Sequence, residues 1–274
     1  MPAEKAPSQG TPAVETFELT RRFGAHVAVD HVTLTVPPGA IFGLLGPNGA
    51  GKSTTLKMLT TLLEPTAGTA RVAGCDIVRD PQEVRRRIGY VPQLLSADGT
   101  LTGYENLLIS AKLHGLSRAQ RRERIAQALK FMGLEEAAHV LVRRYSGGMI
   151  RRLEIAQAML HEPEVLFLDE PTTGLDPLAR RAVWSHIRDL RQRYGTTILL
   201  TTHDMEEADE LCDYVAILHR GRIAVVGPPT TLKAEIGPEA SLEDVFARYT
   251  GGEIVEGGTY RDVVRHRRTA RRLG

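Results

Sequence analysis

The chain has 274 residues, of which 42% are hydrophobic and 25% charged, with a formal net charge of +2 at pH 7. This length and composition are typical of a globular protein with one large domain, or with a domain and an added lobe. The small net charge gives no argument for a nucleic-acid partner, and we expect none. Cys75 and Cys212 form no C-x-x-C pair, which predicts a reduced, intracellular chain without a structural metal.

The two ends differ from the body in composition. Residues 1–14 are rich in Pro and Ala and hold no apolar run, so we expect a disordered leader and not a targeting segment. Residues 251–274 form a basic tail, densest between Arg261 and Arg272, for which a solvated tail and a contact with acidic lipid headgroups both stay open. No apolar run approaches the roughly 18 residues of a membrane span, so any membrane role is expected to come through a partner.

In chain order, the first elements are short runs with strand-like alternation. Val32, Leu34 and Val36, for example, would share one face of an extended segment. These runs predict a small antiparallel sheet. They are ETFELTRRFG (15–24), HVTLTV (31–36) and GTARVAGCDI (68–77).

Other runs are continuous and apolar, and helical patterns separate most of them. Such runs predict parallel strands buried on both faces, with helices on either side, so the main body is expected to have an α/β fold. They are AIFGLLG (40–46), IGYVP (88–92), EVLFLDEP (164–171), TTILLTT (196–202) and YVAILH (214–219).

A polar, helical insertion from about residue 100 to 144 separates the second of these runs from the third. Thr102 and Ser117 each have, three residues later, the Glu or Gln that a capping box requires, which predicts two helix starts. We therefore expect a helical lobe over about residues 94–160.

The last part of the body predicts a hairpin through Arg220 and Gly221, followed by a short helix over Ser241–Thr250. The apolar residues of this helix recur at helical spacing, so we expect them to be buried. They are Leu242, Val245, Phe246 and Tyr249.

GPNGAGKST, residues Gly46–Thr54, matches the phosphate-binding pattern G-x-x-x-x-G-K-[ST] between a strand and a helical pattern, a context that disfavours a chance glycine-rich turn. Its backbone N–H groups can surround phosphates, Lys52 would neutralise them, and Ser53 would bind Mg²⁺. The motif predicts a P-loop NTPase core with a mostly parallel sheet and flanking helices, joined by the antiparallel β-subdomain and the helical lobe. The expected nucleotide-binding residues are Gly46, Pro47, Asn48, Gly49, Ala50, Gly51, Lys52, Ser53 and Thr54.

Two acids and a histidine follow other buried strands. VLFLDEP puts Asp169 at a strand end, where it can complete the Mg²⁺ shell, and Glu170 beside it can act as the base for the attacking water. His203 follows TTILLTT at the same edge, which favours a contact with the γ-phosphate. Without the phosphate loop, solvated strand ends and a structural histidine would be the alternatives.

RRYSGGMIRR, residues Arg143–Arg152, begins a helix in an unusual way. Ser146 is a good N-cap, and Gly147 and Gly148 leave the first turn without side chains, so its N–H groups can meet an anion. The sequence therefore holds a second phosphate cradle.

Together and in this order, these motifs resemble those of the nucleotide-binding subunit of ABC transporters over roughly residues 15–250. In that family two subunits pack head to tail, and each ATP lies between the phosphate loop of one and the signature helix of the other. The corresponding segments are the Walker A motif at Gly46–Thr54, the Q-loop at Gln93 in GYVPQ, the signature YSGGM at Tyr145–Met149, the Walker B motif at Val165–Asp169 followed by Glu170, the D-loop GLDP at Gly174–Pro177, and the switch histidine His203.

The resemblance implies further roles. Ser146, Gly147 and Gly148 would hold the γ-phosphate that a second copy binds through its Lys52. Gln93 would contact Mg²⁺ and the lytic water and move with the lobe that binds a membrane partner. The expected catalytic residues are then Glu170, His203 and Gln93. The expected Mg²⁺ ligands are Ser53, Gln93 and Asp169. Phe23 would stack on adenine, and Ala28 and Asp176 would also lie at the nucleotide.

The signature departs from L-S-G-G-Q, since Tyr145 replaces Leu and Met149 replaces Gln. This variant, with IFGLLGPNGAGKSTTLKML, EVRRRIGYVPQ, LTGYENL and SLEDVF, resembles the subfamily related to daunorubicin-resistance exporters. That likeness implies a separate ABC-2-type membrane permease, a place on the cytoplasmic face of the membrane, and export of drugs, antibiotics or lipid-like compounds. A soluble ABC ATPase of repair, translation or cluster assembly is the alternative, disfavoured because one cassette and no coiled coil occur.

Overall fold

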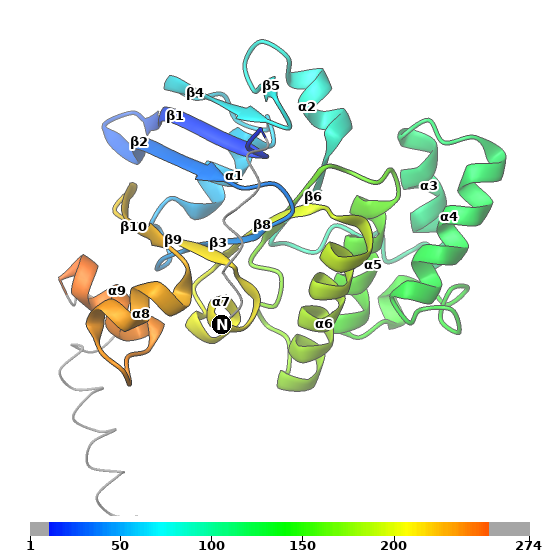
Figure 1. Cartoon of the computed structure of the whole chain (residues 1–274). Helices are drawn as coiled ribbons and strands as arrows, with labels where there is room; N and C mark the ends of the chain where they lie inside the picture. Colours follow the sequence, from blue (N-terminus) through cyan, green and yellow to red (C-terminus); the bar gives the residue numbers. More distant parts are fainter. Residues whose placement is uncertain (1–10, 252–274) are drawn as a thin grey trace, which may run out of the picture.

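The computed structural model describes residues 11–251, and these residues form two β-sheets with helices packed around them (Figure 1). Within these residues one sheet has four strands in the order β2-β1-β4-β5, and the other has six in the order β10-β9-β3-β8-β7-β6. The four-stranded sheet contains β1 (Val14–Phe23), β2 (His26–Val36), β4 (Ala67–Val72) and β5 (Cys75–Asp76). The six-stranded sheet contains β3 (Ile41–Leu45), β6 (Ile88–Val91), β7 (Val165–Asp169), β8 (Thr197–Thr202), β9 (Tyr214–His219) and β10 (Arg222–Gly227).

The four-stranded sheet is antiparallel, as the sequence predicts. Strand β1 pairs with β2 on one side and β4 on the other. Val32, Leu34 and Val36 of β2 are all buried, so the predicted apolar face is confirmed. This sheet begins earlier than the expected leader allows, because Ala13 is buried and Val14 starts β1. The leader expected over residues 1–14 lies outside the described residues as far as residue 10.

The six-stranded sheet is parallel except at one edge. Strand β3 pairs in parallel with β8 and β9, and β7 lies in parallel between β6 and β8. Strand β10 joins β9 in antiparallel fashion through the predicted hairpin at Arg220 and Gly221. The carboxyl ends of the parallel strands therefore meet at one edge, where the loop after β3, Asp169 and His203 follow their strands.

Hydrophobic cores lie on both faces of the six-stranded sheet. Phe42, Leu44 and Phe167 belong to the core shared with the antiparallel sheet and α1. Leu45 and Leu168 point to the opposite core, which α3 to α9 cover, whereas Val84 of α2 belongs to the first core. The helices are α1 (Lys52–Leu59), α2 (Pro81–Arg87), α3 (Gly103–Leu113), α4 (Arg118–Phe131), α5 (Gly147–Met159), α6 (Pro177–Tyr194), α7 (Met205–Leu211), α8 (Pro229–Ile236) and α9 (Leu242–Thr250), with a 3-10 turn, η1, at Val142–Arg144.

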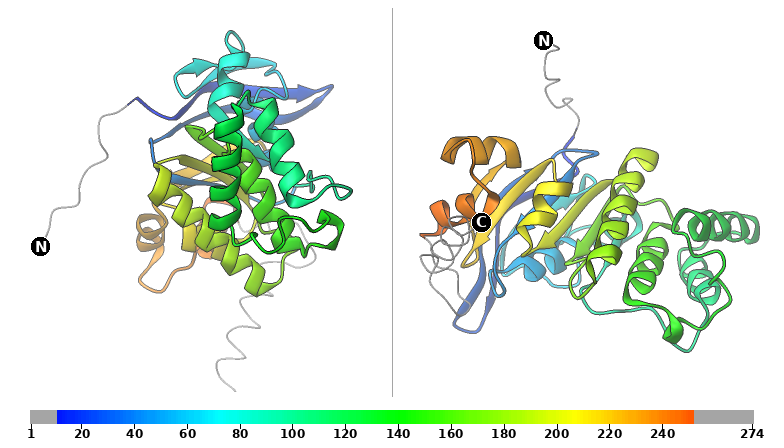
Figure 2. Two further views of the ribbon diagram at one scale, coloured as in Figure 1. Left: turned by 90° about the vertical axis from the view of Figure 1, so that its right-hand side faces the viewer. Right: turned by 90° about the horizontal axis from the view of Figure 1, so that it is seen from below.

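Helices α3 and α4 form a lobe to one side of the sheets, and α5 and α6 lie between this lobe and the six-stranded sheet (Figures 1 and 2). Both predicted helix starts are confirmed, since Thr102 and Ser117 make complete capping boxes at α3 and α4. None of the helices between residues 11 and 251 is long and apolar enough to cross a bilayer.

Helices α8 and α9 lie at the end of the structure away from the lobe (Figure 2). Leu242, Val245 and Phe246 of α9 are buried as expected, but Tyr249 is 39% exposed, so its predicted burial is wrong. The Tyr249 hydroxyl instead donates to Glu235 of α8 at 3.0 Å, which keeps the ring at the surface. The basic tail lies outside the described residues except for Gly251, which follows α9.

Candidate functional site

The phosphate loop joins β3 to the first turn of α1, and residues Gly46–Thr54 occupy it as predicted. Gly51 is in the left-handed region, at a φ of 106°, and a Cβ there would lie 2.4 Å from the carbonyl oxygen of Ala28. At Gly46 a Cβ would lie 2.2 Å from the carbonyl oxygen of Leu218. The sequence needs glycine at both positions because neighbouring backbone leaves no room for a side chain.

Lys52 lies inside this loop, with only 4% of the residue exposed. Its ammonium donates to the carbonyl oxygens of Gly46 and Pro47, at 2.7 and 3.2 Å, and lies 3.3 Å from Glu170 Oε1. Burial lowers the pKa of Lys52, and the charges of Glu170 and Asp169 oppose that shift. The loop thus surrounds a cation held by groups that a phosphate can displace.

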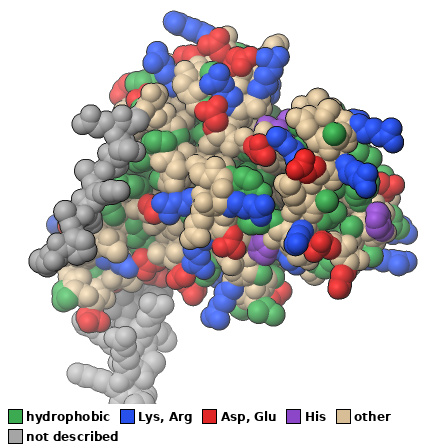
Figure 3. Space-filling model, turned by 45° about the vertical axis from the view of Figure 1, so that its right-hand side comes forward, with side chains coloured by type: hydrophobic (Ala, Val, Ile, Leu, Met, Phe, Trp, Pro, Cys, Tyr) green, Lys and Arg blue, Asp and Glu red, His purple; other side chains and the backbone are tan. Residues whose placement is uncertain are grey.

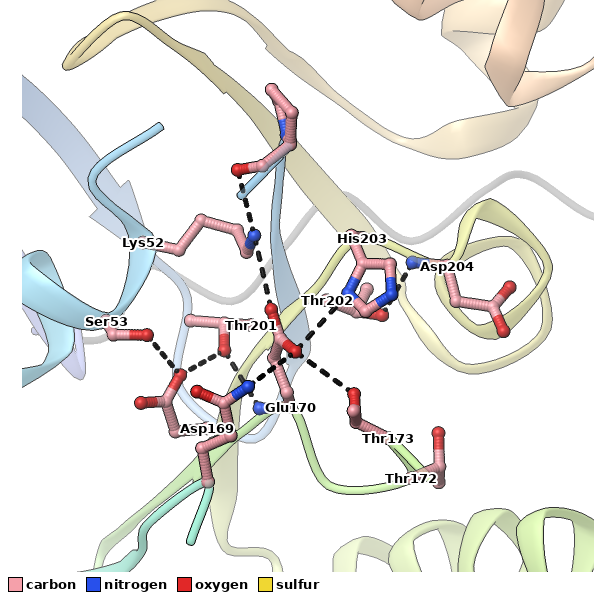
Figure 4. Close-up of polar contacts among 12 residues, drawn as sticks. Lys52, Ser53, Asp169, Glu170, Thr172, Thr173, Thr201, Thr202, His203 and Asp204 are labelled. Atoms are coloured by element: carbon pink, nitrogen blue, oxygen red, sulfur yellow. Dashed lines mark hydrogen bonds and ion pairs between the residues drawn. The ribbon is translucent and has the colours of Figure 1, made fainter. Parts of the chain in front are cut away.

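Asp169 ends β7 beside the start of α1. Its Oδ1 accepts hydrogen bonds from Ser53 Oγ at 2.9 Å and from Thr201 Oγ1 at 2.6 Å (Figure 4). These are hard oxygen donors, of the kind that Mg²⁺ takes together with substrate phosphates. The described residues contain no cluster of three or more His, Cys, Asp or Glu side chains that could hold a metal alone. The donor set fits a magnesium ion that arrives with a nucleotide.

Glu170 is the centre of the site. Gln93 Nε2 donates to its Oε2 at 3.1 Å, Thr173 Oγ1 donates to the same atom at 3.0 Å, and His203 Nδ1 lies 3.3 Å away (Figure 4). Burial alone would raise the pKa of Glu170, but the charges of Lys52 and His203 and the hydrogen bonds outweigh it, so this pKa lies below its ordinary value. The carboxylate is therefore ionised and able to accept a proton.

The predicted catalytic residues come from separate elements. Gln93 follows β6, Glu170 follows β7 and His203 follows β8, and all three meet because these parallel strands end at one edge. Glu170 has a φ of 47°, and its N–H donates to Thr201 Oγ1 at 2.9 Å. The turn after β7 thus aims the carboxylate back at the phosphate loop.

The second cradle lies at the start of α5. Ser146 caps the helix by accepting from the Met149 N–H at 3.3 Å. A Cβ on Gly148 would lie 2.8 Å from Ala179 Cβ of α6, whose N-cap is Asp176. Within residues 11–251, no recorded hydrogen bond or ion pair joins Ser146, Gly147 or Gly148 to Lys52. The described part of the chain therefore shows no direct polar link between the two segments predicted to bind phosphate.

Tyr145 gives a physical reason for the departure in the signature motif. Its hydroxyl donates to the carbonyl oxygen of Ala137 at 2.6 Å, and the residue is 8% exposed. A Cβ on Gly103 would lie 2.3 Å from that hydroxyl, so the small residue at the start of α3 makes room for the phenol. Tyr145 thus ties the start of α5 to the lobe.

Phe23 and Ala28, both expected at the nucleotide, are placed differently. Phe23, at the end of β1, is 47% exposed, and the guanidinium of Arg21 lies 4.7 Å from its ring centroid. Ala28 is buried in β2 behind the loop, where its carbonyl oxygen approaches Gly51.

Some polar residues around the site carry no sequence motif. Glu207 of α7 is 1% exposed and accepts from Thr172 Oγ1 at 2.7 Å and Trp184 Nε1 at 2.9 Å. Arg151 and Glu154 of α5 are also buried. An acidic run after His203 and an Arg-rich helix look like solvated surface in sequence, and only the packing of α5, α6 and α7 shows otherwise.

Known proteins resemble this chain in sequence and in fold. The sequence model of the ABC transporter family matches residues 29–173. The daunorubicin/doxorubicin resistance ATP-binding protein DrrA of Streptomyces peucetius is 49% identical over 84% of this chain and 69% of its own length. The Nod factor export ATP-binding protein I of Paraburkholderia xenovorans is 46% identical over 82% of this chain and 74% of its own. A solved ATP-binding subunit of an ABC transporter superposes with a TM-score of 0.77 at 33% identity, covering 87% of this chain and 99% of that one.

Proposed function

The chain belongs to the ABC transporter family, and from that premise we propose that it is the ATP-hydrolysing subunit of an ABC-2-type exporter. Membership of this family implies that the chain binds ATP and hydrolyses it in a reaction coupled to transport. The observation that carries the assignment to individual residues is the convergence of Gln93, His203 and Lys52 on the one carboxylate of Glu170.

Nucleotide binding is assigned to the phosphate loop. On arrival of ATP, the Lys52 ammonium exchanges its backbone carbonyl partners for phosphate oxygens, and the N–H groups of Gly46–Thr54 surround the phosphates. Ser53 and Asp169 would hold Mg²⁺, with Gln93 as the further predicted ligand. The ion, when bound, supplies positive charge that offsets the charge developing on the phosphates.

Hydrolysis needs a base beside the γ-phosphate. Water attacks the γ-phosphorus, the bond from that phosphorus to the bridging oxygen of ADP breaks, and the proton of the water passes to Glu170. The lowered pKa of Glu170 keeps its carboxylate ionised, which is the form that a base requires. Gln93 and His203, held at 3.1 and 3.3 Å from the carboxylate, orient the water and the γ-phosphate.

The second cradle calls for a second copy of the chain. Ser146, Gly147 and Gly148 are assigned to the γ-phosphate bound by Lys52 of the other copy, and Asp176 to the same interface. A head-to-tail, twofold arrangement satisfies both cradles at once, and it encloses two ATP molecules. This follows the family pattern, and among the described residues no hydrogen bond or ion pair joins the two segments within one chain.

The membrane partner is assigned to a hollow that we call the core-lobe groove. Its lining combines core and lobe residues, namely Leu62, Arg85, Tyr90, Ser110, His114 and Gln157. Leu94 and Leu113, 82% exposed each, add apolar surface on the Q-loop and on α3. On the face that Figure 3 shows, basic and acidic side chains are interspersed. We propose that a segment of an ABC-2-type permease binds in this groove and holds the chain at the cytoplasmic face of the membrane.

The proposed substrate class is amphipathic: drug-like, antibiotic or lipid-like compounds. Two relatives of similar identity support this range, because one is named for resistance to daunorubicin and doxorubicin and another for export of Nod factor. In this arrangement the permease contacts the transported molecule and this chain does not.

A flotation experiment separates the exporter from a soluble ABC ATPase. We expect the full chain to float with membrane vesicles from the cell that produces it, and Leu94→Asp with Leu113→Asp to reduce the bound fraction at least about tenfold. Val226→Asp is the matched control, since Val226 is 42% exposed on β10, at the opposite edge of the sheet from β6. Equal flotation of the variant at Leu94 and Leu113 and the control would contradict a permease contact at this surface, and no flotation of the parent would favour the soluble alternative.

A further inference from the structure

A buried ion pair on α5 lies beneath the Q-loop. Arg151 Nη1 and Glu154 Oε2 are 3.0 Å apart on successive turns of the helix, and their side chains are 3% and 1% exposed. Both charges point away from solvent, toward residues 92–97. Neither residue belongs to a motif that touches nucleotide.

Arg151 binds the backbone that carries Gln93. Its Nη1 donates to the carbonyl oxygen of Pro92 at 2.8 Å, and its Nη2 donates to the carbonyl oxygen of Gln93 at 2.9 Å. The guanidinium therefore spans two successive peptide carbonyls and the carboxylate of Glu154. A lysine ammonium, as a compact point charge, cannot reproduce this planar set of bonds.

Glu154 binds the next part of the same loop. Its Oε1 accepts from the N–H of Ser96, from Ser96 Oγ at 3.1 Å and from the N–H of Ala97 at 3.3 Å. Between the two anchored ends, Leu94 and Leu95 are 82% and 54% exposed. The pair thus fixes the loop by its backbone and leaves the side chains between the anchors facing outward.

The ion pair lies between parts of two proposed ATP sites, with Gln93 in the site of its own chain and the Ser146 end of α5 in the site of the second copy. The Gln93 side chain reaches Glu170 of its own chain at 3.1 Å. Ser146, the N-cap of α5, lies about one and a half turns before Arg151, and that end of the helix is assigned to the ATP of the second copy. A rigid helix joins them, so a shift of the Q-loop backbone is carried to the signature end.

The chemistry of the pair favours a positional role. Two buried charges stabilise a fold little more than a well-packed apolar pair of similar size would. The ion pair instead fixes the position of the Q-loop relative to α5, because its hydrogen bonds form only when the loop and the helix keep one relative placement. The backbone of the Q-loop supplies four of these hydrogen bonds.

We propose that Arg151 and Glu154 are positioning residues that couple the Q-loop of one ATP site to the signature helix that completes the other. Through this pair, a change at Gln93 on binding or loss of the γ-phosphate moves the cradle at Ser146 over the nucleotide of the second copy. The inference rests on the proposed two-chain site.

A double-mutant cycle tests the coupling through ATP hydrolysis by the full chain. We expect Arg151→Lys to lower kcat about tenfold with KM for ATP changed less than about twofold, because monomer binding does not use the pair. Added to Gln93→Ala, Arg151→Lys should cause no further loss, since both act through one loop. Arg152→Lys is the matched control: Arg152 also lies on α5 but donates to Met132 at the end of α4, and its effect should multiply with that of Gln93→Ala. If the losses of kcat caused by Arg151→Lys and by Gln93→Ala multiply in the double variant, the proposal is overturned.

A double variant separates a loss of coupling from a loss of stability. Arg151→Met with Glu154→Leu replaces the ions by apolar side chains, and we expect an unfolding midpoint at least equal to the parent together with the same loss of kcat. Parental kcat in this stable variant would also overturn the coupling. To separate this inference from the two-chain site, ATP-driven association of Glu170→Gln is measured in parallel. If Glu170→Gln associates with ATP but the effects of Arg151→Lys and Gln93→Ala on kcat are independent, only the coupling is rejected. If Glu170→Gln does not associate, the two-chain site is rejected.

Discussion

Ser53 Oγ donates to Asp169 Oδ1 across 2.9 Å, although the two residues are 116 positions apart in the chain. The bond exists because β3 and β7 both flank β8 and end at the same edge of the sheet. It brings a helix-start hydroxyl and a strand-end carboxylate together. A Mg²⁺ ion would replace this hydrogen bond with two oxygen ligands.

Removing the carboxylate should therefore remove the effect of magnesium on ATP affinity. We expect Asp169→Asn to bind ATP without Mg²⁺ as the parent does, and to lose at least about tenfold of the affinity that Mg²⁺ adds. Fluorescence titration with and without Mg²⁺ measures both quantities. Asp76→Asn is the control, since Asp76 lies on β5 and accepts from Val78 and Thr69. Full Mg²⁺ enhancement in Asp169→Asn would rule out the assigned site.

The base assignment predicts a loss of hydrolysis without a loss of binding. We expect Glu170→Gln to lower kcat at least about 100-fold, because an amide cannot accept the proton of the attacking water. Its ATP affinity should stay within about threefold of the parent. Steady-state phosphate release and nucleotide titration check the two parts, and a parental kcat would remove Glu170 from the mechanism.

Stacking on adenine predicts a difference between two exposed phenylalanines of β1. Phe23→Ala should weaken ATP binding about tenfold, the value typical of one base stacked on an aromatic ring, whereas Phe23→Trp should keep it. Phe17→Ala is the matched control, since Phe17 is 43% exposed on the same strand. Equal ATP dissociation constants for Phe17→Ala and Phe23→Ala would disprove the stacking.

A stacked histidine pair in the core-lobe groove predicts how stability depends on pH. The rings of His114 and His161 are 3.8 Å apart and nearly parallel, and His161 Nε2 donates to the carbonyl oxygen of Ile88. Burial, followed by the charges of His114 and Arg124, lowers the pKa of His161 from 6.5 to about 4. Between these values the unfolded chain takes up a proton that the folded chain does not, so the contribution is complete above pH 6.5 and is lost as the pH falls toward 4.

Substitution isolates this contribution. From pH 7 to pH 5 we expect the parent to lose about 1–2 kcal/mol more free energy of unfolding than His161→Gln, which keeps a hydrogen-bond donor but does not titrate. Urea unfolding at both pH values measures the difference. His26→Gln, at the exposed first residue of β2, should behave like the parent. The same loss in His161→Gln as in the parent would contradict the account.

Much of this architecture follows from local sequence patterns. Alternation at Val32, Leu34 and Val36 predicts the antiparallel sheet, and the capping boxes at Thr102 and Ser117 predict the starts of α3 and α4. The motif acids and His203 can be expected to meet because parallel strands share one carboxyl edge. These features depend on residues close in sequence, or on a general rule of topology.

Other features depend on contacts between distant segments. Tyr249 has the spacing of a buried residue, yet the position of α8 leaves it exposed and bonded to Glu235. Arg151 and Glu154 lie in a polar stretch that looks solvated, and only the course of the Q-loop over α5 shows why both are buried. Charge burial of this kind has no local pattern, so sequence reasoning does not find it.

The signature helix can be tested apart from the base. We expect Ser146→Glu to bind ATP as a monomer with parental affinity, because its side chain has no polar contact with the phosphate loop. Turnover should fall at least about 100-fold, since a carboxylate at that cradle repels the γ-phosphate of the second copy. Loss of ATP binding by the monomer would show that the cradle belongs to the site of its own chain.

The most direct measurement is sedimentation equilibrium of the Glu170→Gln variant. The account predicts a monomer without nucleotide and a dimer with saturating MgATP, and a monomer again when Lys52→Ala or Ser146→Glu is added, since each removes one half of the shared site. A Glu170→Gln chain that binds MgATP to saturation and keeps the mass of a monomer would contradict it.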